Sequence, residues 1–475
     1  MIMDLAQLPD VSNWLVTADN PARHDISGMD HERCAALHNY LLHYAWLAEG
    51  RPSANLSNNT NTFFTVHGTA AELVRTRLNV SLATFLDTAK LPPEDVDWFP
   101  FFFWAGGLSD PASLIDEGLT DLFDQPEDSL VCLYFPNVGQ GGESGGGVLY
   151  HQRDHRAAVF MHMDDLDFAL PVEAHRELWH PLETVLSNWI GLIHLGKVAA
   201  SPRDEPALYD SEKIGPWEWR PYSEAQVTSC ISAWNRLCEA IEARMPPQPP
   251  PVADPEPLLT PATLDGASVP QDCFSRSFLT AARRPLFDFV APGLLLPPAD
   301  TSAFAAVQPF VKLSRGCHTV PSVCIFPAAG GEEVDITELS YLFSTGIDDS
   351  VLSRVLAGVY TEPVDRSNYD YAEEGFRMLL PYGFRGDWDD NLCARKSDGS
   401  AIERNKGTEL FQHGYKPFGG DYYRAQRLER LFECWFKLVD DGIWSVGPQG
   451  VEGTIDTFKE ADTERWKDYL IPPTW

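Results

Sequence analysis

The chain has 475 residues, of which 44% are hydrophobic and 12% aromatic, and its 69 acidic and 36 basic residues give a formal net charge of -33. This length allows two or three domains of ordinary size, and the hydrophobic content indicates a chain that folds. The excess of negative charge disfavours functions that need a broad basic surface for phosphate backbones.

The cysteines and the N-terminus indicate a cytoplasmic protein. Nine cysteines are scattered along the chain without a Cys-x-x-Cys pair, which is typical of reduced, mostly buried thiols. The first ten residues have neither the basic start nor the apolar core of a secretory signal, and no apolar run approaches the length of a membrane span. We therefore expect a cytoplasmic protein with no membrane partner.

The first half of the chain contains predicted helices and strands. Apolar residues repeat at helical spacing over 30–48, and Gly50 marks the end of that helix. A second helix is predicted from Pro181 to Gly196, because proline suits a first helical turn. Ser223 and Gln226 form a capping-box pattern that opens a third helix. The strand-like segments are 129–135 and 156–163.

A glycine-rich segment, 139–147, lies between these two strands and predicts a flexible hairpin-type loop. It lacks the third glycine and the following helix of a dinucleotide fingerprint, and the chain has no P-loop lysine. We therefore predict no nucleotide cofactor.

The most apolar seven-residue run is Trp-Phe-Pro-Phe-Phe-Phe-Trp at 98–104, followed by Gly106 and Gly107. Such a run favours a strand in the core. The alternative is an aromatic pocket for a planar substrate, in which Trp104 contacts the substrate.

A proline-rich segment at 246–270 divides the sequence, because its prolines can neither continue a helix nor lie inside a sheet. We interpret it as an extended connector between an N-terminal half, 1–245, and a C-terminal half, 271–475. Two domains and a long loop within a single fold both agree with this pattern.

The C-terminal half again mixes the two kinds of element. The sequence predicts a strand over 322–326 and helices over 349–358 and 421–441. Strands and helices do not alternate regularly, so we expect an α+β fold in which amphipathic helices pack on a mixed sheet.

Five histidines and several acidic residues gather between Tyr150 and His180. His155, His162, Asp164 and Asp165 are the best-placed set, because His162 and Asp164 alternate on one face of the predicted strand. A metal-dependent hydrolase or oxygenase could use them. The sequence has no His-Glu-x-x-His motif, which favours hydrogen-bonded histidines without a metal.

The same carboxylates could transfer protons without a metal. Asp164, Asp165 and Asp167 place three like charges within four residues, and burial would raise the pKa of at least one of them. Such a group suits proton transfer during a condensation or a hydrolysis. For Asp167 an exposed acidic turn explains the pattern as well.

The run at 98–104, the block at 151–167, the segment from His180 to Ile190 and the closing Trp-Lys-Asp-Tyr-Leu-Ile-Pro-Pro-Thr-Trp475 resemble filamentous-fungal proteins of similar length. Among these we place the arginine-containing cyclodipeptide synthases. The resemblance implies aminoacyl-tRNA substrates, one of them arginyl-tRNA, and a diketopiperazine product of secondary metabolism. The Asp-Asp-x-x-Glu motif associated with that family does not occur in this chain, so the resemblance assigns no catalytic residue.

We therefore predict a biosynthetic enzyme of the aminoacyl-transferase type. The predicted catalytic residues are His155, His162, Asp164 and Asp165, and the predicted substrate-binding residues are Asp167 and Trp104. An amino acid or another small molecule is the expected substrate, and no cofactor or bound metal is expected. A metal-dependent enzyme that uses the same residues and a non-catalytic interaction protein are the two alternatives.

Overall fold

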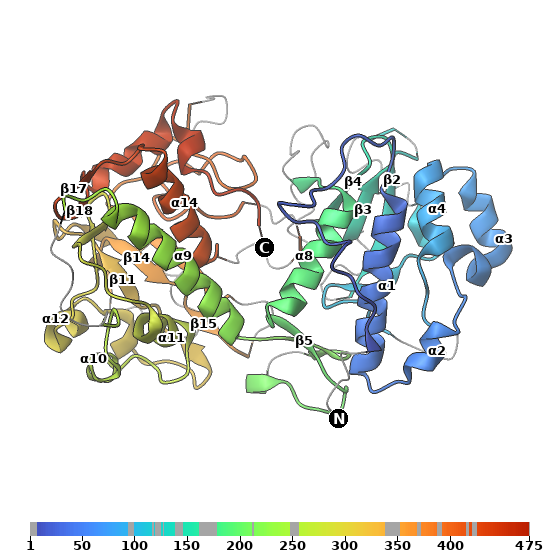
Figure 1. Ribbon diagram of the computed structural model, residues 1–475, viewed down its shortest axis with the longest axis horizontal. Coiled ribbons are helices and arrows are strands. Elements are labelled where there is room, and N and C mark those ends of the chain that lie inside the picture. Colours follow the sequence, from blue (N-terminus) through green and yellow to red (C-terminus); the bar gives the residue numbers. More distant parts are fainter. Residues whose placement is uncertain are drawn as a thin grey trace. The chain divides into compact units, whose positions relative to one another are not determined.

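The computed structural model describes residues 7–93, 99–115, 118, 125–126, 128–137, 146–160, 178–210, 213–247, 256–337, 352–367, 372–386, 392–414, 418–419 and 425–474. The chain divides into two compact units (Figure 1). The first unit comprises 1–220, 415–422 and 473–475, and the second comprises 221–414 and 423–472. The sequence predicts an α+β fold, and the observed helices and largely antiparallel sheets confirm it.

The first unit contains a four-stranded antiparallel sheet in the order β1-β2-β3-β4. Its strands are β1 (Ala105–Leu108), β2 (Leu130–Pro136), β3 (Gly147–His151) and β4 (Arg156–Phe160). The predicted strand at 129–135 is confirmed as β2, and the described part of the predicted strand at 156–163 is β4. The aromatic residues 99–104 are buried, but the strand begins only at Ala105.

Two long helices cover one face of this sheet, namely α1 (His31–Ala48) and α8 (Leu182–His194) (Figure 1). Tyr134 of β2 reaches this layer, where its ring lies 5.8 Å from that of His38 on α1 and 6.4 Å from that of Trp189 on α8. Leu130 and Cys132 belong to a buried cluster with Trp179. Because both faces of the strands are buried, their sequences are apolar throughout rather than alternating.

The remaining elements of the first unit are shorter. A second antiparallel sheet has the order β5-β7-β6. Its strands are β5 (Val198–Ala200), β6 (Lys213–Ile214) and β7 (Trp217–Trp219). The short helices of the unit are α2 (Ser53–Ser57), α3 (Phe63–Arg75), α4 (Val80–Thr88), α5 (Pro111–Leu114) and η3 (Leu208–Asp210).

The second unit begins before the predicted connector, since it includes helix α9 (Glu224–Glu242). The sequence places the break after residue 245, whereas the units divide after Arg220. Packing explains this position. The ring of Trp234 on α9 lies 5.6 Å from that of Phe326 and 5.2 Å from that of Phe432, both in the second unit.

The central sheet of the second unit is antiparallel with the order β11-β14-β16. Its strands are β11 (Cys324–Pro327), which confirms the predicted strand at 322–326, β14 (Gly358–Thr361) and β16 (Phe376–Leu379). Helices α9 and α14 (Leu428–Asp440) pack together beside it.

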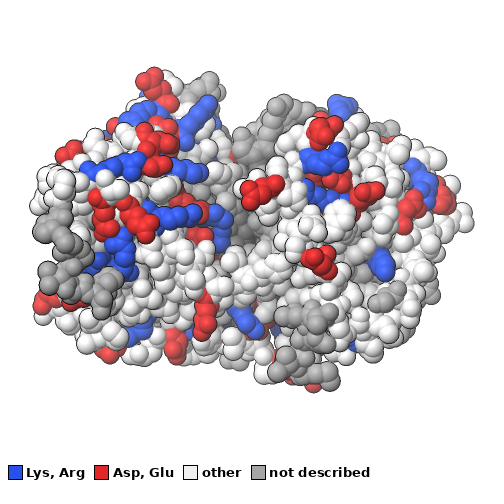
Figure 2. All heavy atoms as spheres, viewed as in Figure 1, with Lys and Arg blue, Asp and Glu red and all other residues white. Residues whose placement is uncertain are grey.

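Helices α9 and α14 run in the same direction. Ser229 donates to Glu429 at 2.7 Å near the start of both helices, and Arg244 pairs with Asp440 at 2.7 Å near their ends. Figure 2 shows basic and acidic side chains interspersed over these helices. Ion pairs this exposed contribute little to stability individually.

Two predicted helices of this half differ from the structure. The segment predicted as a helix at 349–358 contains β13 (Arg354–Leu356) in its described part and runs into β14. Val355 pairs with Val334 in the β12-β13 sheet, and the end of the segment belongs to β14 of the β11-β14-β16 sheet. Pairing with distant strands therefore overrides the short helical pattern. The helix predicted at 421–441 begins at Leu428, because Gln426 and Leu428 make backbone hydrogen bonds to Phe376 and Glu374.

The second part of the proline-rich segment is folded. Thr260 accepts a hydrogen bond from the Thr263 N–H at 3.2 Å and caps helix α10 (Pro261–Gly266), with Pro261 in its first turn. Leu258 and Leu264 are buried. Residues 248–255 lie outside the described residues.

The other elements of the second unit include the sheets β17-β18-β8-β9, β12-β13 and β10-β15. They are α11 (Phe274–Ala281), β8 (Phe289–Ala291), β9 (Leu294–Leu295), α12 (Thr301–Ala306), η4 (Phe310–Lys312), β10 (Thr319–Val320), β12 (Glu333–Asp335), β15 (Val364–Asp365), β17 (Val446–Gly447), β18 (Gly450–Val451), η5 (Ile455–Asp462) and η6 (Trp466–Tyr469). Within the described ranges, no helix combines the length and the apolarity needed to cross a membrane.

Candidate functional site

Most of the predicted site lies outside the described residues. His162, Asp164, Asp165 and Asp167 fall within 161–177, a range that the structure does not describe. His155 and Trp104 are described, and both belong to the first unit.

His155 ends the tight turn between β3 and β4. Its backbone is left-handed, with φ at 55°, and its N–H donates to the His151 carbonyl at 2.9 Å. The imidazole Nδ1 lies 3.1 Å from the hydroxyl of Tyr150, and burial lowers the pKa of His155 despite the nearby Asp154. A non-glycine residue in this conformation is uncommon and is often found at functional sites.

A buried polar group lies close to Tyr150, the hydrogen-bond partner of His155. The Cys34 thiol donates to a Glu183 carboxylate oxygen at 3.6 Å, and both side chains are buried where α1 meets α8. Burial raises the pKa of Glu183 and that of the Tyr150 hydroxyl. Tyr150 is also close enough to Cys34 and Glu183 for their charges to raise its pKa further. A carboxyl group whose pKa is raised in this way can exchange a proton nearer to neutral pH.

Sequence reasoning missed this group. Glu183 shares the buried face of α8 with Leu186 and Ile190, three and seven residues further on. That spacing placed a carboxylate among inward-facing positions, and it was the signal from which a buried acid could have been predicted.

Trp104 is in the aromatic core of the first unit. Its ring lies 5.7 Å from Phe102, 6.4 Å from Trp189 and 5.2 Å from Trp219, and only 1% of the residue is exposed. The described contacts of Trp104 are therefore packing contacts, and its predicted role in substrate binding stays a prediction.

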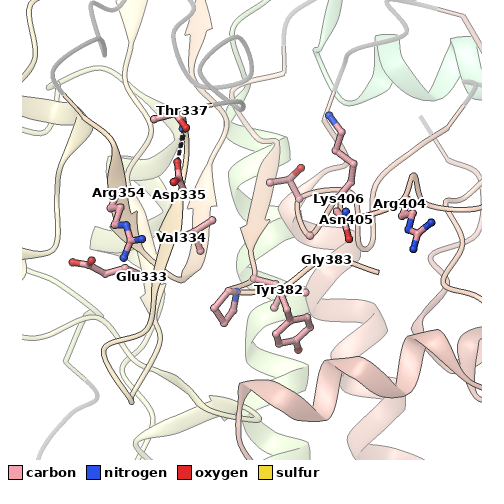
Figure 3. Close-up of a pocket in the computed structure, with 14 residues that line it drawn as sticks. Glu333, Val334, Asp335, Thr337, Arg354, Tyr382, Gly383, Arg404, Asn405 and Lys406 are labelled. Atoms are coloured by element: carbon pink, nitrogen blue, oxygen red, sulfur yellow. Dashed lines mark hydrogen bonds between the residues drawn. The ribbon is translucent and has the colours of Figure 1, made fainter. Parts of the chain in front are cut away.

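The second unit contains a polar cavity of about 650 Å³ (Figure 3). One wall is the β12–β13 ribbon, and the other consists of residues 380–383 and 404–408. The lining residues are Glu333, Val334, Asp335, Thr337, Arg354, Leu380, Pro381, Tyr382, Gly383, Arg404, Asn405, Lys406, Gly407 and Thr408. Its volume is within the range of small-molecule sites.

The second wall is formed by two backbone segments in close contact. A Cβ atom on Gly383 would lie 2.2 Å from the backbone of Asn405, and one on Gly407 would lie 2.3 Å from the Tyr382 carbonyl oxygen. Asn405 itself has φ at 64°, and its N–H donates to Phe384 at 2.9 Å. Because Gly383 and Gly407 have no side chains, the two backbone segments can contact each other, and this contact holds the turn that carries Arg404 and Lys406.

The first wall carries charges of both signs. Asp335 lies opposite Arg354 in the β12–β13 register, but its carboxylate accepts from the Thr337 hydroxyl at 2.6 Å and the Thr337 N–H at 3.0 Å. These hydrogen bonds, and the Arg354 charge to a smaller extent, lower the pKa of Asp335. The Arg354 guanidinium makes no hydrogen bond or ion pair with another described residue.

The cavity is locally positive in a strongly acidic protein. Of the lining residues that the structure describes, three are basic (Arg354, Arg404, Lys406) and two are acidic (Glu333, Asp335), for a net charge of about +1 against -33 for the chain. Figure 3 shows Arg354 on the ribbon side and Arg404 on the opposite side beyond Asn405. The two guanidinium groups therefore do not converge on one point.

Two further lining residues limit what the cavity can do. The Tyr382 hydroxyl donates to the Ile455 carbonyl at 2.5 Å, so it is not available as a proton donor to a ligand. The buried Thr408 hydroxyl has no hydrogen-bond partner in the described part of the chain. The described lining shows no nucleophile held beside a base, so its geometry suits binding better than covalent chemistry.

Another group of buried charges lies near the start of α9 and is internally paired. Glu373 accepts from the Arg366 guanidinium and from the Phe274 N–H, and Glu374 accepts from the Gln226 amide at 3.0 Å. Buried charges that are paired in this way are costly to disrupt. We assign them a role in holding α9, α11 and the chain before β16 together.

No group of three or more metal-ligating side chains occurs among the described residues. No family model matches the chain, and the searches of curated proteins and of solved structures also found no match.

Proposed function

We propose that the second unit binds a small polar molecule with two separated acidic groups in the cavity between β12 and residues 404–408. The observation that carries this proposal is a pair of guanidinium groups, those of Arg354 and Arg404, on opposite sides of a polar cavity of about 650 Å³. Neither guanidinium makes a hydrogen bond or ion pair with another described residue, although the Arg354 charge acts on the Asp335 carboxylate. Charge-assisted hydrogen bonds from arginine to a carboxylate or phosphate are roughly twice as strong as neutral ones.

The proposal is tested with three probes of one length: adipate, hexanoate and adipamide. Calorimetric titration of the full chain should give the order adipate, hexanoate, adipamide, from tightest to weakest. Affinity for adipate should fall as salt is added, because exposed charges are screened within about 10 Å at 0.1 M ionic strength.

Single substitutions then separate the contributions of the two walls. Arg354→Gln and Arg404→Gln should each weaken adipate binding about tenfold, the usual scale for one charged hydrogen bond. Glu333→Gln should strengthen it, because it removes a negative charge from the cavity lining. Arg236→Gln, at an exposed ion pair on α9, is the matched control and should change nothing. Equal affinities for adipate and adipamide would contradict the proposal.

The catalytic function suggested by the resemblance, condensation of aminoacyl-tRNA substrates to an arginine-containing cyclic dipeptide, stays a separate prediction. The observation in its favour is the His155–Tyr150 hydrogen bond beside the buried Glu183, since these groups can carry protons. A heterologous host that expresses the chain should release such a dipeptide, detected by mass spectrometry, and Glu183→Gln should lower the yield. Soluble protein without any cyclic dipeptide would count against this function.

A further inference from the structure

The first unit contains a separate cavity of about 290 Å³ that lies between α1, α3, residues 90–93 and β1. Its volume is at the lower end of the range for ligand sites, so an occupant must be small. The lining residues are His38, Leu42, Val66, His67, Lys90, Leu91, Pro92, Pro93, Phe99, Phe101, Gly106, Gly107, Leu108 and Phe135.

The walls are largely aromatic. Phe101 stacks on His38 with ring centroids 4.6 Å apart, and Phe135 is 41% exposed although it follows a fully buried part of β2. A Cβ atom on Gly106 would lie 2.0 Å from the Phe135 ring, so a side chain at that position would displace the ring. The glycine therefore lets the Phe135 ring lie against β1, where it lines the cavity.

Burial favours the neutral form of both histidines of the cavity. The His38 Nε2 lies 2.8 Å from the Lys90 carbonyl, which can only accept, so Nε2 carries the proton and Nδ1 accepts from the Tyr134 hydroxyl at 2.9 Å. Burial lowers the pKa of His38 to about 4, and burial also lowers the pKa of His67. The lowered pKa of each ring disfavours a positive charge on it in the cavity.

Lys90 is then the one charged residue in the described lining, which contains no aspartate or glutamate. Its backbone is held at both polar atoms, because the N–H donates to the Asn39 amide oxygen at 2.8 Å and the carbonyl accepts from His38. Its ammonium group makes no ion pair with any residue in the described ranges. Within the described lining, one cation without an ion pair lies beside aromatic walls, which favours a ligand with one negative charge and one flat apolar body.

We infer that this cavity is a binding site for a small aromatic carboxylic acid, with the ring against Phe101 and Phe135 and the carboxylate bound by Lys90. The site is independent of the polar cavity of the second unit, which has different residues and favours more highly charged ligands. One carboxylate is matched by the one ammonium group of the described lining, whereas a second acidic group would meet mainly the apolar side chains of that lining.

Benzoate and benzamide are the probes, since they differ in charge but hardly in shape. In ligand-observed NMR titrations of the full chain, benzoate should bind at least about tenfold more tightly than benzamide, the scale of one charge-assisted contact. Lys90→Met should abolish this preference and leave benzamide binding unchanged. Lys437→Met is the matched control, because Lys437 is an exposed lysine on α14 outside the cavity, and it should keep the preference.

A larger side chain that fills the cavity tests whether the probes bind there. Val66→Trp should abolish binding of both probes, and Val66→Met is the milder filling variant if the larger side chain destabilises α3. Thermal unfolding of each variant separates loss of the site from loss of the fold. Equal affinity for the two probes, a preference that survives in Lys90→Met, or binding that survives in a folded Val66→Trp protein would overturn the inference. None of these outcomes depends on Arg354 or Arg404.

Discussion

At the scale of single residues, the structure places chemically identical histidine side chains in different environments. His38 is buried, with both ring nitrogens hydrogen-bonded and its tautomer fixed by the Lys90 carbonyl. His155 is half-buried in a turn, where its imidazole lies within hydrogen-bond distance of the Tyr150 hydroxyl. The first environment holds a neutral ring in place, and the second leaves a ring able to change its protonation state.

The depressed pKa of His38 predicts loss of stability in mild acid. Unfolded histidine binds a proton below about pH 6.5, whereas folded His38 does so only below about pH 4. The unfolded state therefore binds more protons in this window, and the free energy of unfolding falls as the pH drops from 6.5 to 4, by about 3 kcal/mol in total. Above pH 6.5 this contribution is fully present.

Urea unfolding at pH 7.5 and at pH 5.0 tests this prediction. The native chain should lose about 2 kcal/mol more on acidification than His38→Gln, which lacks the titrating group. His24→Gln, at an exposed histidine, should behave like the native chain. If the native chain and His38→Gln lose the same free energy, His38 does not titrate as proposed.

At the scale of elements, helices with strong local signals follow their sequences. Helix α1 begins after Asp30, whose carboxylate accepts from the Arg33 N–H, and it ends just before Gly50, where φ is 76°. Helix α9 begins with the predicted capping box, in which Ser223 and Gln226 each accept a backbone hydrogen bond from the other at 3.1 Å. Caps act within one turn, so the sequence alone predicts them.

The capping box should contribute measurably to the second unit. Ser223→Ala removes the acceptor for the Gln226 N–H and should lower the free energy of unfolding by about 1 kcal/mol. Ser232→Ala, on the exposed middle of the same helix, should be neutral or slightly stabilising, because alanine is the better helix former there. Thermal or urea unfolding measures both variants, and equal effects of the two substitutions would argue against a specific cap.

Elements that depend on distant partners were predicted less well. The helix predicted at 349–358 contains β13 instead, because Arg354 and Val355 pair with Asp335 and Val334 across a ribbon. The start of α14 lies seven residues after the predicted start, because Gln426 is bound to Phe376. Neither partner is close in sequence, so local periodicity cannot show which pairing prevails.

At the scale of the whole molecule, the net charge of -33 describes the chain but not each of its sites. The visible face mixes acidic and basic side chains over α9 and α14 (Figure 2). Basic side chains also line two cavities of the described structure. Charge summed over a sequence predicts which broad surfaces are disfavoured. It does not predict that a cavity carries the opposite charge to the whole chain, because the charge of a cavity depends on which side chains line it.

The sequence by itself determined the α+β class, the helices with strong caps and the strands β2 and β4 of the first unit, because these depend on neighbours a few residues apart. It also pointed to His155, but the candidate partners His162, Asp164 and Asp165 stay predictions. Only the tertiary structure decided that α9 belongs to the second unit, that Glu183 is buried beside Cys34, and that Lys90 and Arg354 line separate cavities. The physical reason is that burial and pairing between residues distant in sequence are settled by packing, on which a local pattern carries no information.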